Sequence, residues 1–531
     1  MRIMNILSLI HRSIPTDSST LGVIKMHKRH PVIYVLFALL LLIFATGCQE
    51  APGENVIISK NDGVFETALE NGRTKTTSPS TDGQVVSADQ PQESQTQPVE
   101  YQSQFSSTDS SVHFTMDISE KVGVGPMYVV KVSPHYLTAE DAKRVAYSLF
   151  PNATFYEGES PLSDNYSKGE IQTKLNRWSQ YLSPEALEDL LGEPPTENTL
   201  QILSTYIEEY TLKYEQAPEE NPHQPCAWIM KKSSRYLLEE EDLATTDLSQ
   251  DNDEVCTQFT SDEIPYRLSV STRKQNDYKV NLITCIIDDG VSPRNIDERI
   301  FSSRLCRGAK PGQEQVLAIC EKAESYLELF DLGQWQVDEC YVSTRYVGDK
   351  PEYTIRVNAV PEFQGIPALR QRQLTSLRNP NGYAPSQYFT DAQFVFSPGG
   401  NLISFTMYTP LEIQEMIEMD DAIMTMDSLL SRAQEQLTLT DSHHYGLGDF
   451  VFILPEVVSC NVNISKMDFG IARVKIPEQD DSYYYVPAIT LKGCAEYIGQ
   501  ETGKSYYRND SEVALITLNA VDGTVINSTN T

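Results

Sequence analysis

Cysteine is the residue type whose spacing in this chain says most about chemistry. The 531 residues include nine cysteines, and no two are spaced C-x-x-C, so the usual zinc and thioredoxin-like patterns are absent. Cys48 stands apart because it ends an apolar run. The other eight cysteines are an even number, which is compatible with disulfides in an exported chain. Several could instead be small buried hydrophobic residues. The eight are Cys226, Cys256, Cys285, Cys306, Cys320, Cys340, Cys460 and Cys494.

Two cysteine pairs fall on neighbouring predicted elements. Cys320 lies on a predicted helix, and Cys340 lies on the strand that follows it. Cys460 and Cys494 lie on candidate neighbouring strands near the end of the chain. Either arrangement allows the Cα separation of roughly 4.4–6.8 Å that a disulfide needs. If a disulfide forms, Cys460–Cys494 is the preferred pair.

The segment before Cys48 has the layout of an export signal. The run PVIYVLFALLLLIFATGC occupies residues 31–48 and follows the basic residues Lys28 and Arg29. A positive region, a short apolar region and small residues at a cleavage point are typical of a secretory signal. The run is shorter than the roughly 18 or more apolar residues expected of a spanning helix. We predict that residues 1–47 are a signal peptide with Met26 as its true start, the alternatives being an ordinary signal or an uncleaved anchor.

The end of this run resembles a bacterial lipobox. It reads Ala45-Thr46-Gly47-Cys48, with alanine where leucine is common. In proteins with a lipobox, the cysteine thiol receives a diacylglyceryl group, and cleavage leaves that cysteine as the first residue. The resemblance implies that acyl chains such as palmitate on Cys48 hold the protein to the cell membrane on its extracytoplasmic face. Two acyl chains are enough for stable anchoring.

The charge balance of the chain excludes one class of partner. The formal net charge is −32 at pH 7, from 74 acidic and 42 basic side chains. A chain this acidic repels nucleic acid, so we predict no nucleic-acid partner. The acidity suits a soluble surface that attracts cations or basic proteins.

Composition and periodicity divide the chain after the signal into four parts. Residues 48–111 are a predicted flexible spacer, because much of this stretch is rich in Ser, Thr, Gln, Asp and Pro and cannot bury enough apolar surface. Residues 112–311 form a predicted N-terminal α+β domain. Residues 312–426 and 427–531 read as one helix-plus-sheet unit used twice. The predicted fold class is α+β, with helices packed on antiparallel sheets.

Helix signals are clear in several places. Thr138 and Asp141 have the spacing of a capping box that opens a helix running to Phe150. Ser183 followed by proline opens another helix, and Gly192 ends it. Further helices are predicted over residues 170–182, 197–215, 313–330 and 427–437.

The end of the chain resembles a PepSY-like module. The resemblance rests on Val486-Pro487-Ala488 within a strand, followed by the turn Asn519-Ala520-Val521-Asp522-Gly523. Similar modules occur in exported regulators of cell-wall histidine kinases and in protease inhibitor segments. The resemblance implies that both C-terminal units are PepSY-like.

The order of short motifs is also similar to that of an uncharacterised family of Gram-positive membrane lipoproteins, defined by a domain of unknown function. That family implies a surface lipoprotein and supplies no catalytic residues. The motifs are the lipobox, VIISKNDG at residues 56–63, Val132-Ser133-Pro134, YEQAP at residues 214–218, and the PepSY-like ending.

Three other patterns each fail a requirement of the chemistry that they suggest. Gly503-Lys504-Ser505 ends like a phosphate loop, but Ile498 stands where the first glycine is required. Adjacent residues such as His443 and His444 point to opposite faces of a strand, which suits metal binding poorly. An acidic stretch ending at Glu254 has Cys256 where an EF-hand needs glycine. We therefore predict no catalytic residue, no cofactor and no metal.

These observations favour a non-enzymatic binding or regulatory lipoprotein of the cell envelope. Its partner would be an envelope protein, a peptide or an envelope polymer. One alternative is an envelope hydrolase whose site the sequence does not reveal. Another is a substrate-binding lipoprotein of a transporter, which is disfavoured because the chain lacks the βαβ alternation of two doubly wound lobes.

The lipobox reading predicts the outcome of one substitution. Cys48→Ala removes the thiol that would carry lipid, so the chain should move from the membrane fraction to the medium, or stall before cleavage. Fractionation and fatty-acid labelling measure this. A variant that labels and fractionates like the parent would contradict the prediction.

Overall fold

The computed structural model describes most of the chain after residue 63. The chain divides into two units, residues 1–58 and residues 59–531, and every described residue belongs to the second. The described ranges are 64–75, 95–124, 127–158, 166–220, 223–232, 253–275, 278–287, 296–369, 390–419, 423–439, 457–475, 482–499 and 505–526.

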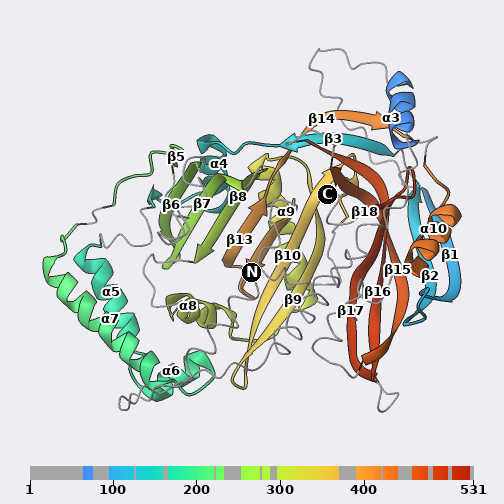
Figure 1. The fold of residues 1–531 in the computed structure, drawn as a ribbon. Helices are drawn as coiled ribbons and strands as arrows, with labels where there is room; N and C mark the ends of the chain where they lie inside the picture. Colours follow the sequence, from blue (N-terminus) through green and yellow to red (C-terminus); the bar gives the residue numbers. More distant parts are fainter. Residues whose placement is uncertain are drawn as a thin grey trace, which may run out of the picture. The chain divides into compact units, whose positions relative to one another are not determined.

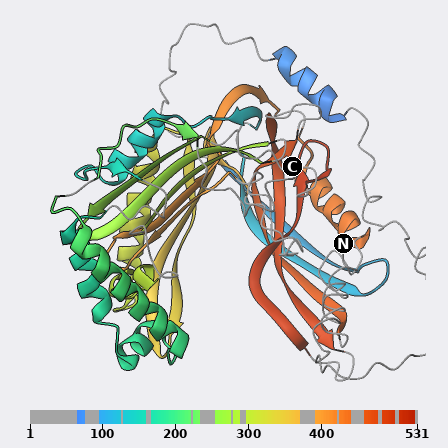
Figure 2. The ribbon, with the colours of Figure 1, turned by 60° about the vertical axis from the view of Figure 1, so that its left-hand side comes forward.

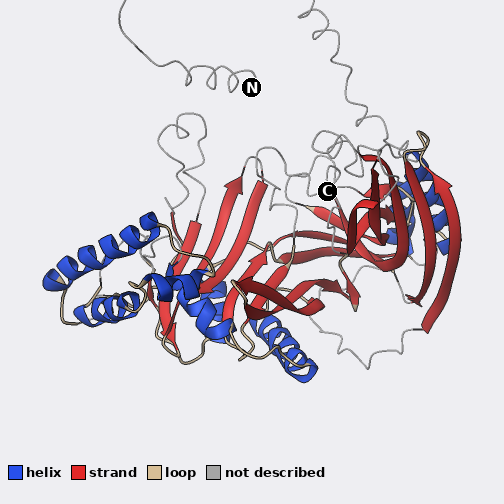
Figure 3. Ribbon diagram, turned by 90° about the horizontal axis from the view of Figure 1, so that it is seen from below, coloured by secondary structure: helices blue, strands red, loops and turns tan. Residues whose placement is uncertain are grey.

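Helices and two large sheets make up this unit (Figure 1), which confirms the predicted α+β fold class. Strands form much of the described chain (Figure 3). No helix among the described residues is long and apolar enough to cross a membrane. The helices are α3 (Val64–Lys75), α4 (Ala139–Leu149), α5 (Lys168–Ser179), α6 (Pro184–Leu191), α7 (Glu197–Gln216), α8 (Ile296–Cys306), α9 (Gln313–Phe330) and α10 (Met426–Leu439).

The first sheet joins the two ends of the described chain. Its strands follow the order β1-β2-β15-β16-β17-β18, and β3 pairs with both β14 and β16. The blue β1 and β2 thus share a sheet with the red C-terminal strands (Figure 2). The strands are β1 (Gln95–Ser106), β2 (Val112–Val124), β3 (Tyr128–Pro134), β14 (Leu411–Glu418), β15 (Val457–Lys475), β16 (Tyr483–Gly499), β17 (Ser505–Asn519) and β18 (Val525–Ile526).

The second sheet follows the order β11-β10-β12-β13-β8-β7-β6-β4, with β5 beside β6 and β9 beside β10. Antiparallel pairing runs through it. The strands are β4 (Tyr156–Glu157), β5 (Lys231–Lys232), β6 (Asp253–Ser261), β7 (Ile264–Gln275), β8 (Tyr278–Ile287), β9 (Trp335–Val347), β10 (Lys350–Phe363), β11 (Ile366–Pro367), β12 (Ala392–Phe396) and β13 (Leu402–Tyr408).

The largest apolar cluster joins α4 and α9 to the second sheet. On the helix side, Phe330 is fully buried and its ring centroid lies 5.2 Å from that of Phe405 on β13. Phe394 on β12 stacks on Phe405 at 4.5 Å. Such ring pairs add to the stabilisation that burial alone provides. Alternating apolar residues on each strand therefore meet the apolar stripe of α9, as the period of the sequence requires.

The sheets do not follow the predicted boundaries at 311/312 and 426/427. β8 pairs with β13 across the first of these boundaries. β14, from the predicted first unit, pairs with β3, and β15, from the second, pairs in parallel with β2. The two predicted helix-plus-sheet units are thus not self-contained. Their strands complete sheets begun by the N-terminal part, because long-range pairing leaves no local trace in sequence.

The predicted spacer, residues 48–111, contains two ordered elements. β1 pairs with β2 along its whole length, and Val99 on β1 is buried. Its apolar residues Val99, Tyr101 and Phe105 are separated by even numbers of positions, so all three lie on one face, with polar residues between them. Because the overall composition of this stretch is polar, the sequence predicted a flexible spacer and not a strand.

α3 also lies within the predicted spacer and packs on β14. Arg73 makes two hydrogen bonds of 2.9 Å to the carboxylate of Glu415. A Cβ atom on Gly72 would lie 2.6 Å from Ile417 Cγ2 and 2.9 Å from the Glu418 carbonyl oxygen. The close approach of helix and strand therefore depends on glycine at this position.

Gly72→Leu should release α3 from β14. Leucine raises helix propensity, yet its side chain collides with Ile417, and such overpacking costs about 1–3 kcal/mol. We expect faster tryptic cleavage at Arg73. The matched control is Glu70→Leu, at an exposed position of the same helix, which should leave the cleavage rate unchanged. Equal rates in the two variants would show that α3 does not depend on this contact.

Candidate functional site

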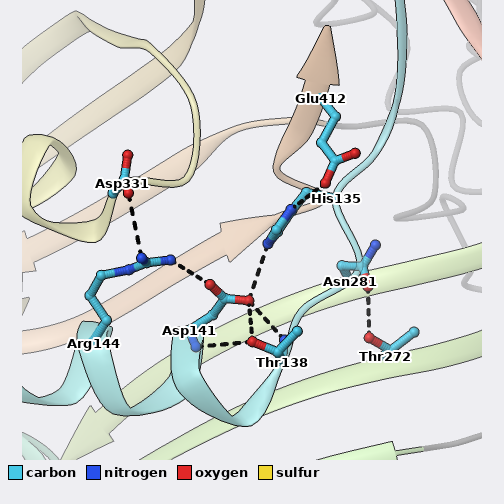
Figure 4. A network of polar contacts seen from close by, with 8 residues as sticks. All are labelled: His135, Thr138, Asp141, Arg144, Thr272, Asn281, Asp331 and Glu412. Carbon is cyan, nitrogen blue, oxygen red and sulfur yellow. Dashed lines mark hydrogen bonds and ion pairs between the residues drawn. The ribbon is translucent and has the colours of Figure 1, made fainter. Parts of the chain in front are cut away.

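A polar network surrounds His135, where β3 ends and the chain turns into α4 (Figure 4). Its ring Nδ1 lies 2.7 Å from Glu412 Oε1 on β14. Its Nε2 lies 3.1 Å from Asp141 Oδ2 on α4. The backbone N–H of His135 donates to the Pro410 carbonyl at 2.7 Å. One side chain thus connects a strand end, a helix start and a neighbouring strand.

Asp141 is the buried centre of this network, with an exposed fraction of 4%. Its Oδ2 accepts hydrogen bonds from the Thr138 backbone N–H at 2.8 Å and from the Thr138 hydroxyl at 2.7 Å. Its Oδ1 accepts from Arg144, which also reaches Asp331 at the end of α9. The predicted capping box of Thr138 and Asp141 is confirmed.

Opposing effects set the charge of the two central groups. Burial alone would raise the pKa of Asp141, but the hydrogen bonds from Thr138 and His135 outweigh burial and lower that pKa. Burial alone would lower the pKa of His135, but Glu412 and Asp141 outweigh it and raise that pKa. The geometry therefore favours the imidazolium form, with both ring nitrogens donating to carboxylates. In that form the ring has no lone pair for a metal or for a substrate proton.

Two buried polar residues lie beside this network. Asn281 is drawn next to it in Figure 4, and Thr409 precedes Pro410, whose carbonyl accepts from His135. The Thr272 hydroxyl donates to Asn281 Oδ1 at 2.7 Å, and the Thr409 backbone N–H donates to the Asn281 carbonyl at 2.8 Å. Asn281 Nδ2 and Thr409 Oγ1 are buried and have no hydrogen-bond partner among the residues that the structure describes. Thr409 has a φ of 43°, a conformation that costs energy in a β-branched residue. Bridging water would relieve the unpaired atoms.

β9 forms a second candidate site, at one edge of the second sheet. Within the described residues, β9 pairs with β10 alone. The pairing register shifts by one residue at Asp338, because Glu339 pairs with Asn358 while Val337 pairs with Ala359. This β-bulge keeps Val337 and Cys340 on the same face, where both pack against the core.

The rest of β9 is accessible. Tyr341 has an exposed fraction of 40% and Tyr346 one of 70%. Val347 is the one buried residue of β9, whereas most residues of the interior strand β16 are buried. An extended strand with accessible residues and one paired side can accept another strand.

The face of the sheet beside Tyr341 is polar. Asn358 donates from Nδ2 to Glu339 Oε2 at 3.0 Å. Gln393 donates from Nε2 to Asn358 Oδ1 at 2.9 Å. Arg356 lies directly across from Tyr341 in the ladder. Glu339, Asn358 and Gln393 form a hydrogen-bonded row across β9, β10 and β12.

The predicted disulfide Cys460–Cys494 is not formed, and both thiols are free. In the ladder between β15 and β16, Cys460 pairs with Tyr497, while Cys494 pairs with Asn463. Cys494 lies three residues before Tyr497, the ladder partner of Cys460, so the two cysteine side chains point to opposite faces of the sheet. The prediction was wrong because it relied on the two strands being neighbours. A disulfide also requires a pairing register that brings both side chains to the same face of the sheet.

Other residues considered from the sequence fall in different places. Cys48, the predicted lipidation site, lies outside the described residues, as do His443 and His444. Glu254 lies on β6, where the Ser269 hydroxyl donates to its carboxylate. Within the described ranges, no group of three His, Cys, Asp or Glu residues could hold a metal ion.

Comparisons with known proteins identify no family for this chain. No family model matches the sequence, and no curated protein matches it. A solved structure, described as an uncharacterized protein from Eubacterium rectale ATCC 33656, shares 10% sequence identity with it. That match covers 79% of this chain and 92% of the other, with a TM-score of 0.30. A score this low carries no argument about function.

The His135 network predicts a pH-dependent stability. Because the folded-state pKa of His135 is raised above the ordinary 6.5, its contribution is complete below pH 6.5 and is lost as pH rises through the folded-state pKa. His135→Gln should therefore reduce the free energy of unfolding by about 1 kcal/mol near pH 6, and by less at pH 9. Chemical denaturation at several pH values measures this.

His113→Gln is the matched control, because His113 is an exposed histidine on β2. It should leave the free energy of unfolding nearly unchanged throughout. If His135→Gln lowers the free energy of unfolding by the same amount at pH 6 and at pH 9, the charge of His135 does not stabilise the network.

Proposed function

We propose that this chain is a lipid-anchored protein of the extracytoplasmic face of the cell membrane, and that its folded part binds an extended peptide segment along β9. The proposal describes a binding protein and not an enzyme. The observation that carries it is the thirteen-residue strand β9, which pairs on one side only among the described residues. The lipobox-like sequence at Cys48 supports the location.

The first part of β9 is less suitable for pairing than the rest. The bulge at Asp338 interrupts the regular register, and Asp338 and Glu339 bring two acidic groups to the edge. Bulges and charges are the usual protection of an edge strand. Residues 340–346, CYVSTRY, contain neither a bulge nor an acid. We therefore assign binding to residues 340–346.

The far end of β9 is held in place. Arg307 at the end of α8 makes an ion pair of 3.0 Å with Asp189 of α6, and Asp189 also pairs with Lys350. Gly192, just after α6, packs so closely against Gly348 that no side chain fits between them. A strand fixed in this way loses little conformational entropy on binding, which favours affinity.

The partner's chemistry follows from this geometry. Backbone hydrogen bonds along the edge would give affinity, and alternate side chains would give specificity. Tyr341 and Tyr346 offer aromatic surface on either face of the strand. The best ligand is an extended segment of an envelope protein, with apolar side chains at alternate positions.

The anchor would keep this surface near the membrane. α3 begins at Val64 and is docked on β14, so only the chain between Cys48 and Val64 separates the lipid from the folded part. At 3.3–3.6 Å per residue, that segment reaches at most roughly 55 Å. A partner in or near the membrane is therefore within range.

The substitutions Ser343→Pro and Thr344→Pro test whether the peptide binds by backbone hydrogen bonds to the edge of β9. In an antiparallel strand, one of two adjacent residues directs its N–H to β10 and the other directs its N–H away. The variant that stays as stable as the parent has lost the outward N–H. We expect that variant to bind about tenfold less tightly to dodecapeptides selected from a random library on the full mature chain, because one backbone hydrogen bond is lost.

The inward variant serves as the matched control, since it should lose stability. Hydrogen–deuterium exchange on the parent supplies a second measurement, in which the selected peptides should protect amides 340–346. Peptides that protect other edges, or a stable proline variant with full affinity, would refute binding at β9.

A further inference from the structure

Two cysteines face each other where α9 packs on β9. Cys320 lies on α9 and Cys340 on β9, and both side chains are half-buried. The two thiols are close enough for each to shift the pKa of the other. Cys340 Sγ also lies 3.7 Å from the carbonyl oxygen of Val316, one helical turn before Cys320. The Cys340 sulfur therefore lies against the turn of α9 that runs from Val316 to Cys320.

The β-bulge at Asp338 produces this alignment. If the same residues of β9 paired without a bulge, Cys340 would point to the face opposite Val337, away from α9. With it, Cys340 pairs with Val357 of β10 in the ladder and joins the core below α9. Cys285 and Cys306 differ, because they are almost fully buried and less accessible to an exchange partner.

We propose that Cys320 and Cys340 are a disulfide site, oxidised by thiol–disulfide exchange with an oxidised dithiol protein or with glutathione disulfide. The Cys320 thiolate attacks the partner's disulfide, forming a mixed disulfide and releasing one partner thiolate, which takes up a proton. Cys340, after losing its proton, attacks the Cys320 sulfur and displaces the second partner thiolate. The two cysteines lose two electrons, and the partner's disulfide is reduced by two.

The order of attack follows from the different pKa values of the two thiols. Burial raises the pKa of both thiols, and that of Cys340 to about 12. The interaction between the two side chains lowers the pKa of Cys320 and raises that of Cys340, which favours the Cys320 thiolate and disfavours the Cys340 thiolate. Cys320 is thus the better first nucleophile.

The bond would tie α9 to the first residue of the segment 340–346. It would restrict the unfolded chain and hold β9 in its paired position. The site is inferred from geometry alone. Its oxidation in cells, and its use in holding the peptide-binding edge, rest on the proposed function.

The first experiment uses the purified full mature chain, reduced and then incubated with glutathione disulfide at pH 8. Alkylation and non-reducing peptide mapping should then show the Cys320 and Cys340 peptides linked, and thermal unfolding should shift upward by a few degrees. Cys320→Ser and Cys340→Ser should each abolish the shift, whereas Cys494→Ser, a half-buried cysteine on β16, should keep it. Free alkylated thiols at both positions in the parent, or a link to a different cysteine, would overturn the proposal.

A second arm separates this proposal from the proposed function. The chain is alkylated in intact cells before isolation. Linked cysteines in cells would support both the site and export. Linkage by glutathione disulfide in vitro but free thiols in cells would support the site and count against export to an oxidising compartment.

Discussion

The buried carboxylate of Asp141 is the constraint on which the junction of the two sheets depends. A carboxylate that is only 4% exposed must have its charge compensated by donors. Thr138 supplies two of them, and Arg144 and His135 supply the others. Because His135 also contacts Glu412 on β14, the same charge fixes the end of β3, the start of α4 and the neighbouring strand. The packing of α4 on the second sheet follows from this position.

The second constraint is that both sheets are completed by distant parts of the chain. β16 pairs with β15, β17 and β3. Leu369, two residues after β11, donates from its backbone N–H to the Ile471 carbonyl of β15 at 2.7 Å. Such pairings close long loops, and their entropic cost is recovered only when the whole sheet forms. The described part of the chain is therefore expected to fold as one cooperative body, and not as a row of small modules.

Local signals in the sequence predicted local structure well. The fold class, the capping box at Thr138 and the end of α6 at Gly192 were all predictable, because each depends on residues within one or two turns. β1 was missed because its apolar positions alternate within a polar composition. The partnership of His135 with Glu412 was not predictable, since 277 positions separate them in sequence. Register, which decides the cysteine pairs, is likewise a property of the assembled sheet.

β9 shows how one residue changes what a strand can do. Strict alternation predicts that Val337 and Cys340 lie on opposite faces, yet the extra residue Asp338 puts both on the core face. The same bulge disturbs pairing at the start of the edge and leaves residues 340–346 regular. It also brings the Cys340 thiol to Cys320 on α9. Asp338 is the unpaired residue of this ladder, so its deletion should restore regular pairing of Glu339 with Asn358 and of Val337 with Ala359. The deletion should therefore remove the interruption at the start of the edge and leave Cys340 on the core face beside α9.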